Sequence, residues 1–282
     1  MSTRWIGAIV TVFLASSAFG ATPKNFFPEA ARTIAGGRST LVVVSQAELR
    51  SDIAQSNMAM AAGGGLLFAL VDAGVNSSRA KAAEAAIQPL RGALTGFDFD
   101  ALAKDTTAAI VADVSWLDSH DLKTSKDGSR VGLLAALDST PTDQLVTVEY
   151  TYGVAPDFAS MSVTANVTVA LKSAPAGVKP ANRRDAKNLV FSQRFTAQTT
   201  LAHPSKVKAE NVAKWDADNA QLARSTLTAE LADIRLLAVR GLNESEADST
   251  NLTKSRKKTE ALEGGVLSTD GTNLTLARTA VE

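Results

Sequence analysis

The chain has 282 residues, of which 45% are hydrophobic and 21% charged, with 29 lysines and arginines against 29 aspartates and glutamates. This balance excludes nucleic-acid binding driven by bulk positive charge. The absence of cysteine excludes a disulfide framework, a thiolate nucleophile and any sulfur-liganded metal site, although a chain of this length can bury a sizeable core without such links.

Residues 1–20 have the three parts of a cleavable secretory signal. Arg4, the only charged residue among them, precedes the apolar run Trp5–Leu14, and a stretch of small residues follows. Ala18 and Gly20 place small side chains at positions −3 and −1, so we expect cleavage directly after Gly20. A retained membrane anchor is the alternative, but the apolar run is shorter than the roughly 20 residues that span a bilayer. The sequence therefore predicts an exported protein, and we expect it in a bacterial periplasm, where association with the membrane stays open.

The first part of the mature chain combines one buried strand with alanine-rich helices. The β-branched run Thr40–Ser45 predicts the strand. Three helices are expected after it, and their signals are caps, glycines and one proline. They are Asn57–Ala73, interrupted by three glycines, then Ser77–Leu94, kinked at Pro89, and then a helix from Asp100 to about Leu117 with Asp100 as its cap.

The middle of the chain changes from helical periodicity to alternation. Apolar and polar residues alternate over Val146–Val154, Met161–Leu171 and Leu189–Phe195, and Val131–Leu137 is predicted as a further strand. Strands with one apolar and one polar face are typical of an antiparallel sheet that is covered on a single face. The residues near 173–187 are expected to form a polar loop between two of these strands.

A long helix and a hairpin are expected at the C-terminal end. The helix follows Pro204, carries an apolar stripe and ends near Gly241. A charged linker near 244–265 then leads to the hairpin, whose two strands are Gly265–Leu267 and Leu274–Leu276.

Together these elements predict a single α+β domain over residues 21–282. Its strands would form an antiparallel meander, and its helices would pack on one face of that sheet to give a two-layer structure. The sequence contains no internal repeat that would indicate a solenoid or a repeated array.

The polar residues form no ordered catalytic or metal-binding motif. His120 and His203 are the only histidines, and a zinc site with nitrogen ligands would need both of them and a carboxylate, although they lie 83 residues apart. Ser119 and Asp121 flank His120, but adjacent residues cannot adopt the geometry of a catalytic triad. The two aspartates within Phe97–Asp100 lack a third oxygen ligand at fixed spacing and are better explained by a helix cap. We therefore predict no catalytic residues, no metal and no cofactor.

The most unusual segment of the mature chain is Met58–Val71, fourteen residues without a polar or charged side chain. It is too short to span a membrane, and its glycines lack the spacing of a phosphate-binding loop. It is either a helix buried in the core or a surface for an envelope protein or a membrane, because close helix packing in lipid favours small residues. The residues of this possible interaction surface are Gly63, Gly64, Gly65, Leu66, Leu67 and Phe68.

A set of short motifs extends over most of the mature chain. They are the run Ala62–Leu67 followed by Asp72, then Pro89–Arg91 and Phe97–Phe99, and the alternating segment Tyr150–Val167. In these motifs the sequence resembles uncharacterised exported proteins and lipoproteins of Gram-negative bacteria. The resemblance implies an envelope location and no assigned activity. Such relatives often carry a lipidated cysteine, which this sequence lacks.

These observations favour an exported, periplasmic protein without catalytic activity that binds or assembles at the cell envelope. Only 5% of its residues are aromatic, so few rings are present to line a pocket for a small molecule. No nucleic-acid partner is expected. The alternative is a hydrolase or a small-ligand-binding protein whose site is built from scattered Asp, Glu, Ser and Arg residues.

Overall fold

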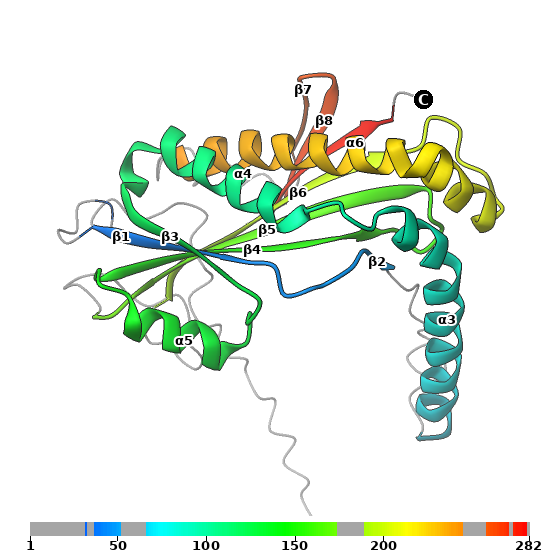
Figure 1. Cartoon of the computed structure of the whole chain (residues 1–282), viewed down its shortest axis with the longest axis horizontal. Helices are drawn as coiled ribbons and strands as arrows, with labels where there is room; N and C mark the ends of the chain where they lie inside the picture. The colour runs from blue at the N-terminus through cyan, green and yellow to red at the C-terminus, as the bar shows by residue number, and fades with distance from the viewer. Residues whose placement is uncertain are drawn as a thin grey trace, which may run out of the picture.

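The computed structural model contains one mixed β-sheet with helices packed against both of its faces (Figure 1). The described residues are 32, 37–51, 66–173, 189–244, 258–270 and 273–280. For residues 66–77 the description covers the helical backbone and not the side chains. The predicted signal lies outside the described residues, as do most of the predicted polar loop and much of the predicted charged linker.

Nine strands form the sheet in the order β3-β1-β4-β5-β6-β9-β8-β7, and the short strand β2 also pairs with β4. Their bounds are β1 (Arg38–Val43), β2 (Arg50–Ser51), β3 (Ser119–Ser125), β4 (Gln144–Val154), β5 (Ser160–Leu171), β6 (Leu189–Thr200), β7 (Lys258–Leu262), β8 (Gly265–Asp270) and β9 (Asn273–Thr279). The helices are α3 (Leu66–Ala93), α4 (Phe99–Asp113), the 3-10 turn η1 (Ser115–Leu117), α5 (Arg130–Ser139) and α6 (Lys208–Asn243).

The α+β class is confirmed, but the arrangement of the layers differs from the prediction. Helices α4 and α6 contact one another and cover one face of the sheet (Figure 1). Helix α5 lies on the opposite face, beside β1 and β4. The expectation that all helices share one face is therefore wrong at this end of the sheet.

Strands β4, β5 and β6 form the antiparallel centre that the alternating segments predicted. The prediction of a purely antiparallel meander is wrong, because β1 lies parallel to β3 and β4, and β9 lies parallel to β6. Parallel neighbours need a long crossover connection. Between β1 and β4 the chain forms α3, α4 and α5, and between β6 and β9 it forms α6. Both connections are long enough for such a crossover.

The main core lies between the sheet and the layer of α4 and α6. Side chains alternate along a strand, so β4 and β5 turn their apolar residues toward these helices. Trp215 of α6 is fully buried, and its indole nitrogen donates a hydrogen bond of 2.9 Å to the carbonyl oxygen of Phe158. The hydroxyl groups of Tyr150 and Thr107 lie 2.9 Å apart between the sheet and α4. The predicted long C-terminal helix with an apolar stripe is thus confirmed.

Helix α5 occupies the position where Val131–Leu137 was predicted to be a strand. Ser129 caps it, because its side chain accepts a hydrogen bond of 3.1 Å from a backbone N–H of the first turn. Leu133 and Leu137 pack against a second, smaller core, which includes Leu41 of β1. Residues four apart share this buried side, which is helical spacing, and a short apolar run does not separate the helical from the extended period.

Helix α3 is continuous, whereas the sequence predicted two helices and a kink at Pro89. The proline lies inside the helix, and its neighbours Ile87 and Leu90 are both fully buried. This packing offsets the backbone hydrogen bond that a proline cannot donate. The predicted break at Gly63–Gly65 lies outside the described residues, and α3 begins at Leu66 directly after it.

Two further details differ in α4 and α6. Asp98, and not Asp100, caps α4, because its carboxylate accepts a 2.9 Å hydrogen bond from a backbone N–H of the first turn. Helix α6 begins at Lys208 rather than directly after Pro204, and it is interrupted at Asp218–Ala220, where φ lies between 52° and 58°. No glycine or proline marks this left-handed turn, and its only sequence signal is Asp218-Asn219, because Asp and Asn adopt left-handed φ more readily than other non-glycine residues.

The predicted C-terminal hairpin is confirmed, with Asp270 of β8 opposite Asn273 of β9. Strand β7 adds a third strand to it and comes from within the region expected to be a linker.

Candidate functional site

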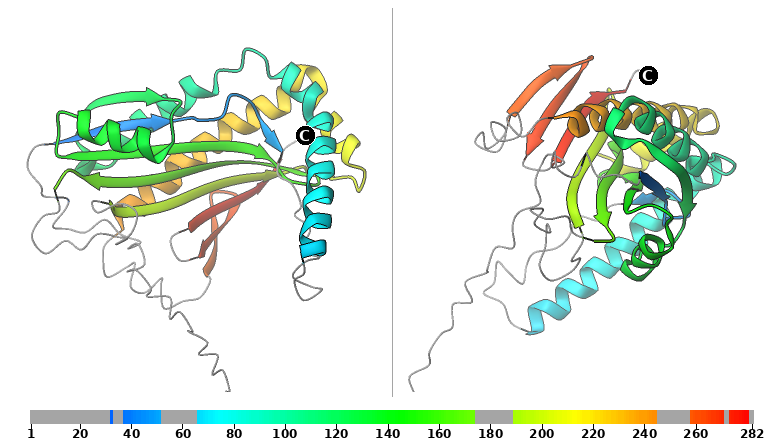
Figure 2. Two further views of the ribbon diagram at one scale, coloured as in Figure 1. Left: turned by 90° about the horizontal axis from the view of Figure 1, so that it is seen from below. Right: turned by 90° about the vertical axis from the view of Figure 1, so that its left-hand side faces the viewer.

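The face of the sheet opposite α4 and α6 is polar across β4, β5 and β6, and we call it the open face. Its side chains alternate with those of the main core, so they point away from α4 and α6. They are Thr147, Glu149 and Thr151 of β4, Ser162, Thr164, Asn166 and Thr168 of β5, and Ser192, Arg194, Thr196 and Gln198 of β6. Viewed from below, Figure 2 shows these strands between α5 at one end and the projecting helix α3 at the other.

A cavity of about 700 Å³ lies on the open face beside β2. Its lining consists of Arg50 and Ser51 of β2, Thr151, Tyr152 and Gly153 of β4, Ser162, Thr164 and Asn166 of β5, and Arg194 and Thr196 of β6. Ten residues from four strands therefore form one polar hollow, which we call the open-face cavity. Sequence analysis assigned no role to any of them, because the segments that supply them are far apart in the chain.

The pairing of the strands sets which groups meet on the floor of this cavity. Asn166 lies opposite Arg194, and the arginine Nε donates a 2.9 Å hydrogen bond to the amide oxygen. In the next row Thr164 lies opposite Thr196, and their hydroxyl oxygens are 3.1 Å apart. The floor thus offers a guanidinium, an amide and a pair of hydroxyl groups in adjacent rows.

Strand β2 reaches the cavity because Gly153 leaves space for it. A Cβ atom at Gly153 would lie 2.8 Å from the carbonyl oxygen of Arg50, which is closer than two such atoms approach. Glycine therefore allows Arg50 to pair with β4 at this point. Ser51 donates a 3.0 Å hydrogen bond to the carboxylate of Glu84, which also connects β2 with α3.

The charge of the open-face cavity is positive. Its lining contains two arginines and no aspartate or glutamate. Within the described part of the chain, neither Arg50 nor Arg194 forms an ion pair. The nearby Glu84 is paired with Arg91 at 2.6 Å, and the hydrogen bond from Arg91 is the main cause that holds the pKa of Glu84 below its usual value. Arg50 adds a smaller effect of the same sign through its charge.

The candidate residues from the sequence do not come together into a catalytic group. His120 lies in the edge strand β3, and His203 lies in the loop before α6, where its carbonyl oxygen accepts a hydrogen bond from Lys214. Asp98 caps α4, and Asp100 pairs with Lys126 at 2.5 Å. Across the described residues no group of three or more His, Asp or Glu side chains is placed to hold a metal ion.

Only part of the predicted interaction surface lies within the described residues. Gly63, Gly64 and Gly65 lie outside the described residues, while Leu66, Leu67 and Phe68 form the first turn of α3. Figures 1 and 2 show that this end of α3 points away from the sheet. The opposite end packs against α6 and β2, where Ile87 and Leu90 are fully buried. Among the described elements α3 is thus the one that projects from the body.

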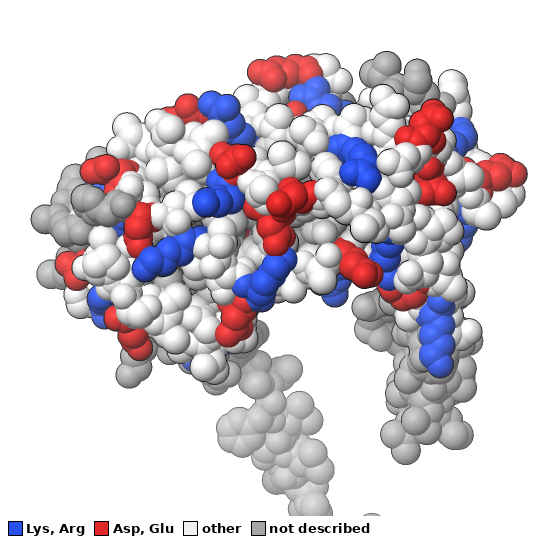
Figure 3. All heavy atoms as spheres, in the orientation of Figure 1, with Lys and Arg blue, Asp and Glu red and all other residues white. Residues whose placement is uncertain are grey.

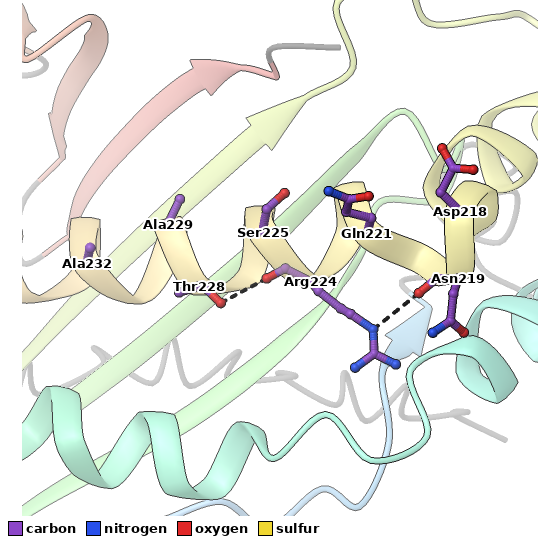
Figure 4. Close-up of a pocket in the computed structure, with 8 residues that line it drawn as sticks. All are labelled: Asp218, Asn219, Gln221, Arg224, Ser225, Thr228, Ala229 and Ala232. Carbon is purple, nitrogen blue, oxygen red and sulfur yellow. Dashed lines mark hydrogen bonds between the residues drawn. The ribbon is translucent and has the colours of Figure 1, made fainter.

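A second hollow lies along α6 just after its left-handed turn (Figure 4). All of its lining residues come from this one helix. Its only basic residue, Arg224, donates hydrogen bonds to the carbonyl oxygens of Asn219 at 3.2 Å, of Ala93, and of Thr95 at 3.4 Å. The guanidinium is therefore used to connect α6 with the C-terminal end of α3, and this hollow offers no free positive charge to a ligand.

Glu230 is a buried acid that the sequence analysis did not identify. It lies on the sheet side of α6 with no exposed surface, and neither carboxyl oxygen has a hydrogen-bond partner of good geometry. Burial raises the pKa of Glu230 well above its usual value, although the nearby Thr199 partly opposes the shift. A glutamate within the apolar stripe of α6, between Leu227 and Leu231, was the available signal. No cavity reaches it, so we assign it no binding role.

Charges of both signs are interspersed over the face drawn in Figure 3, in keeping with the balanced composition. Within the described part of the chain, no helix is both long and apolar enough to cross a membrane. The chain matches no protein-family model, no curated protein and no solved structure.

Proposed function

We propose that this is an exported protein of the bacterial cell envelope, most simply of the periplasm, which binds or assembles there without catalysing a reaction. The observation that carries the proposal is the position of α3, which directs its apolar first turn away from the sheet (Figure 1). The export signal predicted at residues 1–20 supports the compartment.

The length of α3 explains why its first turn needs a partner. A helix of 28 residues is about 42 Å long. Buried residues occur only near its C-terminal end, at Ile87 and Leu90, among those residues of α3 whose side chains are described. The sequence from Leu66 to Val71 is apolar on every side of the helix. A continuous apolar stretch must be covered by other groups, and we propose an envelope protein or the membrane surface for this role.

The test is to shorten the apolar side chains of this turn and to measure association and stability separately. We expect Leu67→Ala and Phe68→Ala to abolish capture of the protein by crosslinking in envelopes, or its sedimentation with phosphatidylglycerol-containing vesicles, while the melting temperature stays unchanged. Ser78→Ala, at an exposed position of the same helix, is the matched control and should change neither result.

A core position for the same residues would give the opposite pattern. Removing a buried Leu or Phe side chain costs about 2–5 kcal/mol, and a domain of this size loses roughly 2–4 °C in melting temperature per kcal/mol. A strongly destabilised Leu67→Ala variant that still associates would therefore contradict the proposal.

The open-face cavity favours a second candidate function, the binding of a small ligand. Its volume lies within the range of about 300–1,000 Å³ that is usual for small-molecule sites. Its lining of Arg, Ser, Thr and Asn side chains can form hydrogen bonds with the polar groups of a ligand. A hydrolase would need a general base to activate a serine, a threonine or a water, and the lining of this cavity contains no histidine, aspartate or glutamate. Binding, rather than catalysis, is the role that this geometry supports.

A further inference from the structure

We propose that the open-face cavity binds an anionic, hydroxyl-rich ligand, a sugar acid or a sugar phosphate, between Arg50 and Arg194. This site would serve the ligand-binding role described above, and it does not depend on association through α3.

Two arginines without acidic partners carry the choice of an anion. Arg50 and Arg194 both line the cavity, both are exposed, and within the described part of the chain neither is neutralised by an ion pair. Glu84, which accepts a hydrogen bond from Ser51 of β2, is already paired with Arg91. A guanidinium group presents parallel N–H donors that match the two oxygens of a carboxylate or a phosphate. The cavity therefore contains two guanidinium groups that form no ion pair within the described part of the chain.

Arg194 is oriented before any ligand arrives. Its Nε donates to the amide oxygen of Asn166 at 2.9 Å, which fixes the plane of the guanidinium and leaves its terminal nitrogens for the ligand. Because the amide oxygen of Asn166 is already engaged, the NH₂ group of the same side chain is the part left to donate. One anionic group could thus meet a guanidinium and an amide donor together.

The distance between the two arginines indicates a ligand larger than a simple ion. Arg50 belongs to β2 and Arg194 to β6, and β4 and β5 lie between them. Neighbouring strands are about 4.8 Å apart, so the strands of the two arginines are about 14 Å apart across the sheet. The row of Arg50 runs through Gly153 and Ser162 to Gln198, which is four residues along β6 from Arg194, so the two backbone positions are about 20 Å apart. Long arginine side chains approach from opposite sides of this strip, and the volume of about 700 Å³ exceeds what an inorganic phosphate would fill.

The groups between the arginines match the hydroxyls of a sugar. Thr164 and Thr196 form a hydroxyl pair in which either oxygen can donate, and Thr151 and Ser162 lie beside them. Hydroxyl groups can both donate and accept, as a sugar hydroxyl requires of its partners. The single aromatic residue of the lining, Tyr152, stacks on Phe99 with ring centroids 3.9 Å apart. The lining therefore favours a polar ligand over a flat apolar one.

The test is a calorimetric titration of the full mature protein at low ionic strength with four probes: glucuronate, glucose 6-phosphate, glucose and inorganic phosphate. We expect glucuronate and glucose 6-phosphate to bind saturably. Glucose and phosphate should each bind at least about tenfold more weakly, because glucose lacks the anionic group and phosphate lacks the sugar hydroxyls. If only one of the two anionic sugars binds, that result distinguishes a carboxylate site from a phosphate site, and both outcomes support the proposal.

Three variants assign the binding to this cavity. Arg50→Ala and Arg194→Ala should each weaken the binding of the anionic sugars by about tenfold or more. Arg194→Lys should weaken it as well. A lysine keeps the charge but lacks the parallel N–H donors of the guanidinium and the Nε hydrogen bond to Asn166. The control is Lys104→Ala, which removes one exposed positive charge from α4 on the opposite side of the sheet and should leave binding unchanged.

Several results would overturn the assignment. No saturable binding of either anionic sugar, or equal binding in the Arg50→Ala and Arg194→Ala variants, would show that these arginines do not form a site. Inorganic phosphate binding as tightly as glucose 6-phosphate would show that the cavity does not recognise the sugar hydroxyls. Glucose binding as tightly as glucuronate would show that the arginines do not recognise an anionic group, although the open face would still bind a ligand. The α3 variants described above test association independently of all these outcomes.

Discussion

Glu230 places a carboxyl group in the buried interface between α6 and β6, where no charged partner neutralises it. Its neighbour on α6, Asp233, is fully engaged, because Arg278 of β9 binds both carboxylate oxygens at 2.6 and 2.8 Å. Burial is the largest cause that raises the pKa of Glu230, and the negative charge of Asp233 acts in the same direction. Glu230 therefore keeps its proton to higher pH in the folded protein than an exposed glutamate does.

This protonation links the stability of the fold to pH. The unfolded chain releases the proton of a glutamate near pH 4.3, whereas the folded chain retains it to higher pH. The folded state thus binds more protons than the unfolded state above about pH 4, and the free energy of unfolding falls as the pH rises. We expect Glu230→Gln to remove this loss, so that the variant is more stable than the parent at pH 8 and the difference disappears toward pH 4.

Urea unfolding at a series of pH values measures this difference directly, because the other titrating groups are common to both proteins. Asp105→Asn, at an exposed position of α4, is the control and should show no such dependence. A difference between Glu230→Gln and the parent that stays constant from pH 4 to pH 8 would contradict the protonation of Glu230.

At the scale of elements, Arg224 connects α6 with the C-terminal end of the projecting helix α3. Arg224 donates to the carbonyl oxygens of Ala93 and Thr95 at the C-terminal end of α3, and its guanidinium lies 5.9 Å from the ring centroid of Phe97. A positive charge at this position also interacts favourably with the negative end of the helix dipole. The left-handed turn at Asp218–Ala220 directly precedes Arg224, and it sets the direction of the part of α6 that carries this residue.

We expect Arg224→Ala to destabilise the protein by about 1–3 kcal/mol, because hydrogen bonds from a charged donor are lost at a partly buried site. Amide hydrogen exchange should increase near the C-terminal end of α3 more than in the central strands. Arg235→Ala on the same helix is the matched control. It removes an exposed pair with Asp113 at 2.7 Å and should cost less than about 1 kcal/mol. Equal effects of the two substitutions, or unchanged exchange in α3, would show that Arg224 does not hold this helix.

Long periodicity explains why the central strands and the C-terminal helix were predicted correctly. The alternation through Val146–Val154 and Met161–Leu171 continues for several side-chain repeats, and the apolar stripe around Trp215 extends over many helical turns. Val131–Leu137 was predicted as a strand because seven residues contain too few repeats to separate the two periods. The interruption at Asp218–Ala220 has no glycine or proline, and Asp218-Asn219 is only a weak signal for it, because Asp and Asn also occur within regular helices.

On the scale of the whole molecule, the order of the strands creates features that no single segment contains. Strands β1 and β9 are parallel to their neighbours because long crossovers connect them, and these crossovers depend on how distant segments pack. The periodicity of each segment taken alone therefore predicted an antiparallel meander. The open-face cavity has the same origin. Arg50 and Arg194 line one cavity only because the strands lie in the order β2-β4-β5-β6. Binary patterning predicted that this face would be polar, but not that two unpaired arginines would share it.

Export is the remaining prediction at this scale, and it concerns residues outside the described fold. The secreted protein should begin at Ala21, because Ala18 and Gly20 give signal peptidase the small residues that it requires. Ala18→Phe places a bulky side chain at position −3, so we expect it to retain the full-length chain in the membrane fraction. Phe19→Leu, which changes only position −2, should be processed like the parent. Intact mass and N-terminal sequencing of both fractions measure this. A full-length parent chain outside the membrane fraction would show that residues 1–20 are not removed, and the envelope role proposed for α3 would then lose its compartment.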